Sequence, residues 1–191
     1  MKNKNIKASL HALTEAAIMI ALATVFSLLR FPPFRIDLWG NGGAVDFVMV
    51  PLIILGWRRG LKWAVPAGLA FGLIDCLIGG SFGYGVLSVL FDYVVAFGAV
   101  GLAGLFKDKK YGLVLGTLVA SLARFVSHFI SGITVWRLAV GDEVELFGHV
   151  FGGDTAVLYS LLYNGSYMLG NMIIALLVVS ILNYPLKKIK K

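Results

Sequence analysis

The chain has 191 residues, of which 59% are hydrophobic and only 14% are charged. About 25% of the residues in an ordinary soluble domain are charged, and a soluble domain of this length could not remove so much apolar surface from water. The composition therefore excludes a soluble enzyme and a disordered chain, and the single cysteine, Cys76, excludes a disulfide-stabilised scaffold. An integral membrane protein is the class that remains.

Six hydrophobic segments predict an all-α fold, an integral membrane bundle of six transmembrane helices in a single domain over residues 1–191. The segments run at about 8–30, 40–57, 63–80, 84–106, 111–135 and 157–183. A bilayer core requires about 20 apolar residues per helix. The first segment is too long for the apolar region of a signal peptide, so we expect it to remain as a helix. Asp46 and Pro51 predict a kink or an unwound turn in the short second segment.

Most of the 17 lysines and arginines fall on one side of this six-helix topology. They are Lys2, Lys4, Lys7, Arg58, Arg59, Lys62, Lys107, Lys109, Lys110, Lys187, Lys188, Lys190 and Lys191. Basic residues flank membrane helices on the cytoplasmic side, so the pattern predicts that both termini are cytoplasmic. The net charge of +7 then reflects membrane topology, and we expect lipid but no nucleic acid as a partner.

The third external connection, at about 136–156, is long and acidic. Connections of this length without predicted helix or strand often act as lids over binding sites. Its sequence fits such a lid and a solvated loop equally well.

An ionisable side chain inside a membrane helix is costly, so each one marks a candidate functional site. Those in the predicted spans, together with one amide, are Glu15, Asp46, Asp75, Asp92, Arg124, His128 and Asn164. Asp92, His128 and Asn164 lie at a similar depth, about 10–12 Å from the outer ends of three helices. They predict either a pocket open to the outside or a hydrogen-bonded cluster that holds the helices together. Arg124, one turn below His128, would tune this site or pair with an acid such as Asp75.

Aromatic residues surround these polar positions. Tyr93 follows Asp92, Trp136 lies about two turns beyond His128, and Tyr159 and Tyr163 precede Asn164. Aromatic faces beside a carboxylate form a good cage for an organic cation, although aromatics also gather at membrane interfaces without any ligand. The pattern favours a cation whose counter-charge is Asp92.

Motifs for catalysis are missing from the sequence. There is no GxxxxGK[ST] motif for ATP and no HExxH motif for zinc. Ser81 and His128 could form an intramembrane nucleophile and base, but Ser81 lies among glycines, where a serine usually makes a turn. We therefore expect no enzyme activity, no cofactor and no metal site.

Three stretches resemble one family: FDYVVAF at 91–97, HFISG at 128–132 and YSLLYNGSY at 159–167. They are similar to the thiamine-specific S-components of energy-coupling factor (ECF) transporters, and the resemblance covers about residues 10–183. It implies a multi-pass protein of the bacterial cell membrane that captures thiamine at the outer face for ATP-driven uptake. It also implies partners: a transmembrane coupling protein and two cytoplasmic ATPase subunits.

Residue by residue, the resemblance assigns Asp92 to the thiamine cation and Tyr93 to the aromatic beside it. It implies further substrate contacts at positions that are Phe71, Phe82, Arg124, His128, Trp136, Tyr159 and Asn164, with Trp39 as an aromatic of the first loop. Ala17 and Ala21 match the small residues of the first helix that face the coupling protein. The stretch between Trp136 and Tyr159 is longer than usual in the family.

Two other transport functions remain open. An S-component for a related ring, such as the hydroxymethylpyrimidine precursor, would depend less on Asp92 because that ligand has no thiazolium. A stand-alone transporter driven by an ion gradient could use Asp92 and Arg124 as coupling groups.

Overall fold

The computed structural model describes residues 2–39, 43–79, 85–136, 143–152 and 155–190. The helical elements are α1 (Lys2–Leu28), α2 (Met49–Arg59), α3 (Leu61–Gly79), α4 (Val86–Ser88), the π-helical η2 (Val89–Val94), α5 (Val95–Val100), the 3₁₀-helical η3 (Gly101–Phe106), α6 (Gly112–Ser131), the π-helical η4 (Gly132–Trp136) and α8 (Ala156–Lys190). The strands are β1 (Arg35–Asp37), β2 (Ala44–Asp46), β3 (Glu143–Leu146) and β4 (His149–Gly152), paired as two antiparallel hairpins. The prediction of a helical membrane bundle is confirmed.

In the described part of the chain, five helices are long and apolar enough to cross a bilayer. They are Ile6–Leu28, Leu61–Gly79, Val86–Phe106, Gly112–Thr134 and Ala156–Leu186. Large apolar side chains on their outer faces, such as Leu122, Leu177 and Ile181, are exposed. Such residues would be costly in water but suit contact with lipid. The exposed faces therefore fit a bundle surrounded by a bilayer.

The second predicted segment was wrong as a single helix over 40–57. Residues 40–42 lie outside the described residues, Ala44–Asp46 form strand β2, and α2 begins only at Met49. Asp46 accounts for the break, because its Oδ1 accepts the backbone N–H of Val48 at 3.0 Å, just before the helix. Such a local side-chain bond competes with helix formation. With 11 residues, or about 16 Å, α2 is too short to span a bilayer, and it lies buried from Met49 to Trp57.

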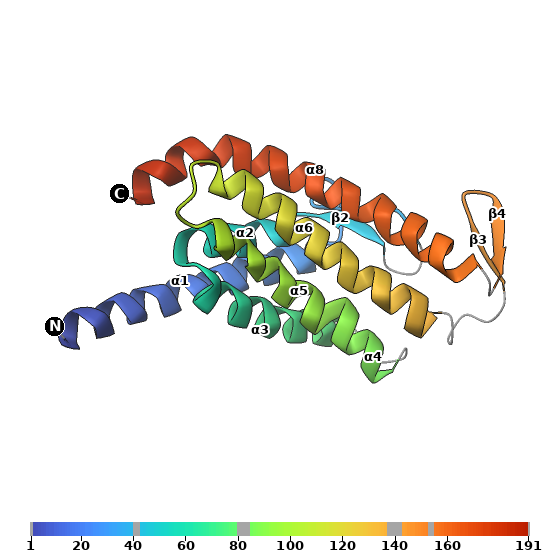
Figure 1. The fold of residues 1–191 in the computed structure, drawn as a ribbon, viewed down its shortest axis with the longest axis horizontal. Coiled ribbons are helices and arrows are strands. Elements are labelled where there is room, and N and C mark those ends of the chain that lie inside the picture. Colours follow the sequence, from blue (N-terminus) through green and yellow to red (C-terminus); the bar gives the residue numbers. More distant parts are fainter. Residues whose placement is uncertain (1, 40–42, 80–84, 137–142, 153–154, 191) are drawn as a thin grey trace.

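The chain termini lie at one end of the bundle and the β3–β4 hairpin lies at the other (Figure 1). The turn from α2 to α3 and the connection from η3 to α6, which carry the predicted basic clusters, lie at the terminal end (Figure 1). There Glu15 of α1 forms ion pairs with Arg58 and Arg59. The intramembrane carboxylate of Glu15 thus fastens α1 to the end of α2.

The acidic third connection contains an ordered hairpin in its described part. Strands β3 and β4 join through a two-residue turn, Phe147–Gly148, in which both residues have positive φ, 54° and 75°. Leu146 is buried in the main apolar core, and Phe151 packs against it. Residues 137–142 and 153–154 of this connection lie outside the described residues. A solvated loop was therefore an incomplete description of this segment.

Candidate functional site

Asp92 lies in the π-helical turn η2, in the middle of the helix that runs from Val86 to Phe106. Single π-helical turns inside helices occur frequently at functional sites. Helix α3 lies very close to this turn, because a Cβ added at Gly72 would be only 2.4 Å from the carbonyl oxygen of Tyr93. The missing side chain of Gly72 therefore lets the backbone of α3 pack directly against the backbone of η2.

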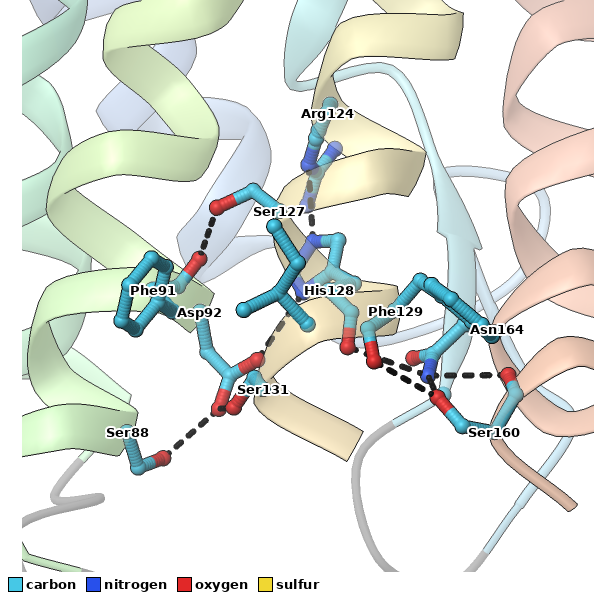
Figure 2. Close-up of polar contacts among 12 residues, drawn as sticks. Ser88, Phe91, Asp92, Arg124, Ser127, His128, Phe129, Ser131, Ser160 and Asn164 are labelled. Atoms are coloured by element: carbon cyan, nitrogen blue, oxygen red, sulfur yellow. Dashed lines mark hydrogen bonds and ion pairs between the residues drawn. The ribbon is translucent and has the colours of Figure 1, made fainter. Parts of the chain in front are cut away.

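Three side chains hold the carboxylate of Asp92. Ser88 and Ser131 each donate to its Oδ2 at 2.7 Å, and Nδ1 of His128 lies 3.2 Å from its Oδ1 (Figure 2). In the described part of the chain, no lysine or arginine lies within ion-pair distance of Asp92. Its side chain keeps 19% of its surface exposed. The site therefore presents a fixed carboxylate with room for one more partner.

His128 links this carboxylate to a buried arginine. The Nε of Arg124 donates to Nε2 of His128 at 3.2 Å, and the guanidinium carbon lies 4.2 Å from the centre of the Phe97 ring. Arg124 does not pair with Asp75, since Asp75 accepts a hydrogen bond from Ser27 of α1. The first of the two predicted roles for Arg124, acting on the site, therefore fits the geometry.

Asn164 of α8 contacts the same cluster through the backbone carbonyl of His128. Its Nδ2 lies 3.2 Å from the carbonyl oxygen of His128, 3.1 Å from that of Ser160 and 3.1 Å from the Ser160 hydroxyl (Figure 2). Its Oδ1 accepts the hydroxyl of Tyr167 at 2.8 Å. Asp92, His128 and Asn164 are thus brought together as their depth predicted. Because three acceptors already lie within hydrogen-bond distance of Nδ2, Asn164 must give up one of these bonds before it can donate to a ligand, whereas Oδ1 has a second lone pair.

A row of aromatic rings on α8 extends from this cluster. Tyr159 stacks on Tyr163 at 5.5 Å between ring centres, and Tyr163 meets Tyr167 edge-on at 5.8 Å. The Tyr167 ring lies 5.8 Å from the His128 ring. Trp39 packs 6.1 Å from Tyr163 and donates its indole N–H to Ser166. The predicted Tyr159 and Trp39 therefore belong to one row of rings that reaches the His128 ring through Tyr167.

The other predicted site residues have different surroundings. Phe71 is fully buried and packs edge-on against Phe97 at 4.6 Å, so it supports the ring beneath Arg124. Tyr93 is half-buried beside Asp92 in η2. The backbone of Trp136 ends η4, but its side chain lies outside the described residues, as does all of Phe82.

Sequence reasoning missed the hydroxyl groups that surround the carboxylate. Ser88 lies four residues before Asp92, and Ser131 lies three residues after His128. Residues three or four apart share one face of a helix, so this spacing was the available signal. Asn171 was also missed: it is buried in α8 and bonds both the carbonyl of Ala44 and the N–H of Asp46 in β2.

The described residues contain no group of three or more His, Cys, Asp or Glu side chains that could hold a metal ion. The side chains of the cluster are of types that suit an organic cation. A carboxylate lies beside flat aromatic faces, both of which attract organic cations, and hydroxyl and amide groups can match polar edges of a ring.

Comparison with known proteins gives consistent matches. A family model described as "Thiamine transporter protein (Thia_YuaJ)" matches residues 13–191. The thiamine transporter ThiT of Bacillus subtilis is 31% identical over 184 residues, which cover 89% of this chain and 88% of that protein. ThiT of Lacticaseibacillus paracasei is 29% identical over 154 residues, 72% of each chain. A solved structure of ThiT from Listeria monocytogenes superposes with a TM-score of 0.76 at 25% identity, covering 95% of this chain and 96% of that one.

Proposed function

This chain belongs to the thiamine transporter (Thia_YuaJ) family, and from that premise we propose that it is the substrate-capture subunit (S-component) of an ECF-type importer, which binds thiamine at the outer face. As a family member it is a multi-pass protein of the bacterial cell membrane. The proposal adds that the chain itself hydrolyses no ATP and that its termini face the cytoplasm. Partner subunits would then supply the energy for uptake.

The observation that carries the proposal is the state of Asp92. Two serine hydroxyls and the His128 ring hold this carboxylate, no lysine or arginine of the described residues lies within ion-pair distance of it, and its 19% exposed surface leaves a direction of approach. Thiamine has a permanently charged thiazolium, and a nearby carboxylate attracts such a cation strongly where water is excluded. The tyrosine row of α8 and Trp39 would cover the flat faces of the ligand.

Docking on the coupling protein would use the outer face of α1. Ala12, Ala16 and Ala23 face the bundle and are buried, whereas Ala17 and Ala21 are exposed. Small residues on an exposed membrane-helix face allow another helix to approach closely. This arrangement supports Ala17 and Ala21 as contacts for the transmembrane partner.

The direct test is a thiamine titration of the purified chain in detergent, followed by tryptophan fluorescence and calorimetry. We expect saturable submicromolar binding. The Asp92→Asn variant should weaken it about 100-fold or more, because the loss of one partner of a buried charge pair costs about 3 kcal/mol or more. Asp75→Asn is the matched control, because Asp75 is another helical aspartate but bonds to Ser27 of α1. It should bind thiamine with unchanged affinity.

The outcomes separate the alternatives. Binding that survives Asp92→Asn would identify the pyrimidine as the determinant, and hydroxymethylpyrimidine alone would then bind as well as thiamine. Absence of any binding heat would refute the thiamine assignment for this chain. For the partners, thiamine uptake into vesicles should require the coupling protein, both ATPases and ATP. Uptake by the chain alone, driven by an ion gradient, would overturn the S-component role.

A further inference from the structure

The contact between Arg124 and His128 fixes where the imidazole carries its proton. The Nε of an arginine side chain always bears a hydrogen and can only donate. Since it donates to Nε2 of His128 at 3.2 Å, Nε2 must offer a lone pair. The single N–H of the neutral ring is then on Nδ1, where it points to Oδ1 of Asp92, 3.2 Å away. Figure 2 shows Arg124 and Asp92 on opposite sides of this ring.

Protonation of His128 would break this arrangement. An imidazolium donates at both nitrogens, so it cannot accept from Arg124, and it would place a second cation 3.2 Å from the first. Arg124 cannot easily move away, because its side chain is buried and its guanidinium rests on the Phe97 ring at 4.2 Å. Repulsion between like charges is strong where water is excluded.

The charged groups that face His128 have opposite effects on its protonation. Asp92 from η2 favours an imidazolium, and Arg124 on α6 opposes it. Tyr167 from α8 contributes an uncharged ring edge at 5.8 Å. If His128 became cationic, it would neutralise Asp92 from inside the protein and compete with a cationic ligand.

We propose that Arg124 is a positioning residue that keeps His128 neutral, with its proton on Nδ1, and thereby keeps the negative charge of Asp92 available for the cation of the ligand. This rests on the proposed function and goes beyond it. Arg124 acts through His128 rather than by touching the ligand. The carboxylate receives a hydrogen bond that orients it but no charge that cancels it.

The test compares thiamine affinity across about pH 6–8, where histidines titrate, for the natural chain, Arg124→Met and Arg124→Lys. The natural chain should bind almost independently of pH. Arg124→Met should lose affinity about tenfold or more between pH 8 and pH 6, as the imidazolium forms and competes. Arg124→Lys keeps a cationic donor and should restore the flat profile. An equal loss at every pH in Arg124→Met would mean that Arg124 contacts the ligand directly, which would overturn the proposal.

A second readout does not depend on ligand binding. Nitrogen-15 NMR of the histidine side chains in the ligand-free protein distinguishes the two neutral forms from the imidazolium, with His128→Gln to identify the signal. We expect a neutral ring protonated on Nδ1 in the natural chain and a growing imidazolium fraction at low pH in Arg124→Met. A charged ring or a proton on Nε2 in the natural chain at neutral pH would refute the proposal even if Arg124→Met failed to fold. Absence of thiamine binding with the expected NMR signals would refute the proposed function alone.

Discussion

The close approach between the start of η4 and α8 predicts a severe effect for one small substitution, Gly132→Ala. A Cβ at Gly132 would lie 2.2 Å from Oγ and 2.8 Å from Cβ of Ser160, and 3.0 Å from Nδ2 of Asn164. Ser160 cannot yield easily, because it is fully buried and its hydroxyl donates to the carbonyl oxygen of Phe129 at 3.0 Å. The helices must therefore separate, and the amide of Asn164 must shift with them.

The magnitude follows from the contacts that are lost. Overpacking of a tight interior typically costs about 1–3 kcal/mol, and each disturbed hydrogen bond adds about 1 kcal/mol. Replacing glycine by alanine in a helix returns about 1 kcal/mol. The expected net loss for Gly132→Ala is about 2–3 kcal/mol. Gly165→Ala on α8 is the control, because its nearest added contact, Cε2 of Phe125, lies at an ordinary 3.9 Å.

The assay is thermal unfolding of the detergent-purified variants with and without thiamine. For a chain of this size, Gly132→Ala should lower Tm by about 5–10 °C and weaken thiamine binding. Gly165→Ala should unfold at or above the natural temperature and bind normally. A Gly132→Ala variant with natural Tm would show that η4 and α8 are not in close contact at Ser160, and the geometry of the site would have to be revised.

Two further substitutions test parts of the fold outside the polar cluster. Phe147→Asn removes a ring that meets Trp39 edge-on at 4.9 Å, while asparagine suits the left-handed turn better than phenylalanine. If the β3–β4 hairpin acts as a lid, stopped-flow fluorescence should show several-fold faster thiamine release at unchanged Tm. An unchanged release rate would contradict a lid that is held by this contact. Glu15→Gln weakens the ion pairs to Arg58 and Arg59 and should lower the free energy of unfolding by about 3 kcal/mol. Thiamine affinity should not change. A weakened affinity at natural Tm would contradict a purely anchoring role.

The position of the polar cluster along the membrane normal could be predicted from sequence. Ionisable and amide groups are rare inside membrane helices, so few candidates exist. The regular rise of a helix converts their residue numbers into depth. Asp92, His128 and Asn164 share one depth by this reasoning, and they meet through the contact between Nδ1 of His128 and Asp92 and through the carbonyl oxygen of His128.

The second segment and the partner of Asp75 could not be predicted, because both depend on contacts distant in sequence. Strand β2 is held by Asn171, which is 125 residues away from Asp46 in the chain. No periodicity within residues 40–57 reports such a bond, so the sequence predicted a kink or an unwound turn in a helix and not a strand. Similarly, hydropathy does not reveal how far α3 is rotated about its axis, and this rotation turns Asp75 towards Ser27 and away from Arg124.

Glu15 and Asp92 are both carboxylates inside membrane helices, but their partners differ. The partners of such a carboxylate, rather than its burial, indicate whether it anchors a helix or is available to a ligand. Glu15 bonds directly to two guanidinium groups, so its charge is neutralised and a further cation would gain little from it. Asp92 contacts hydroxyl and imidazole groups. Arg124 donates to the opposite nitrogen of the same imidazole, so His128 lies between the arginine and the carboxylate. The neutral ring passes on orientation without neutralising the charge. Under the proposed function, a cation arriving from outside would therefore be attracted by Asp92, whereas the charge of Glu15 already holds α1 in place.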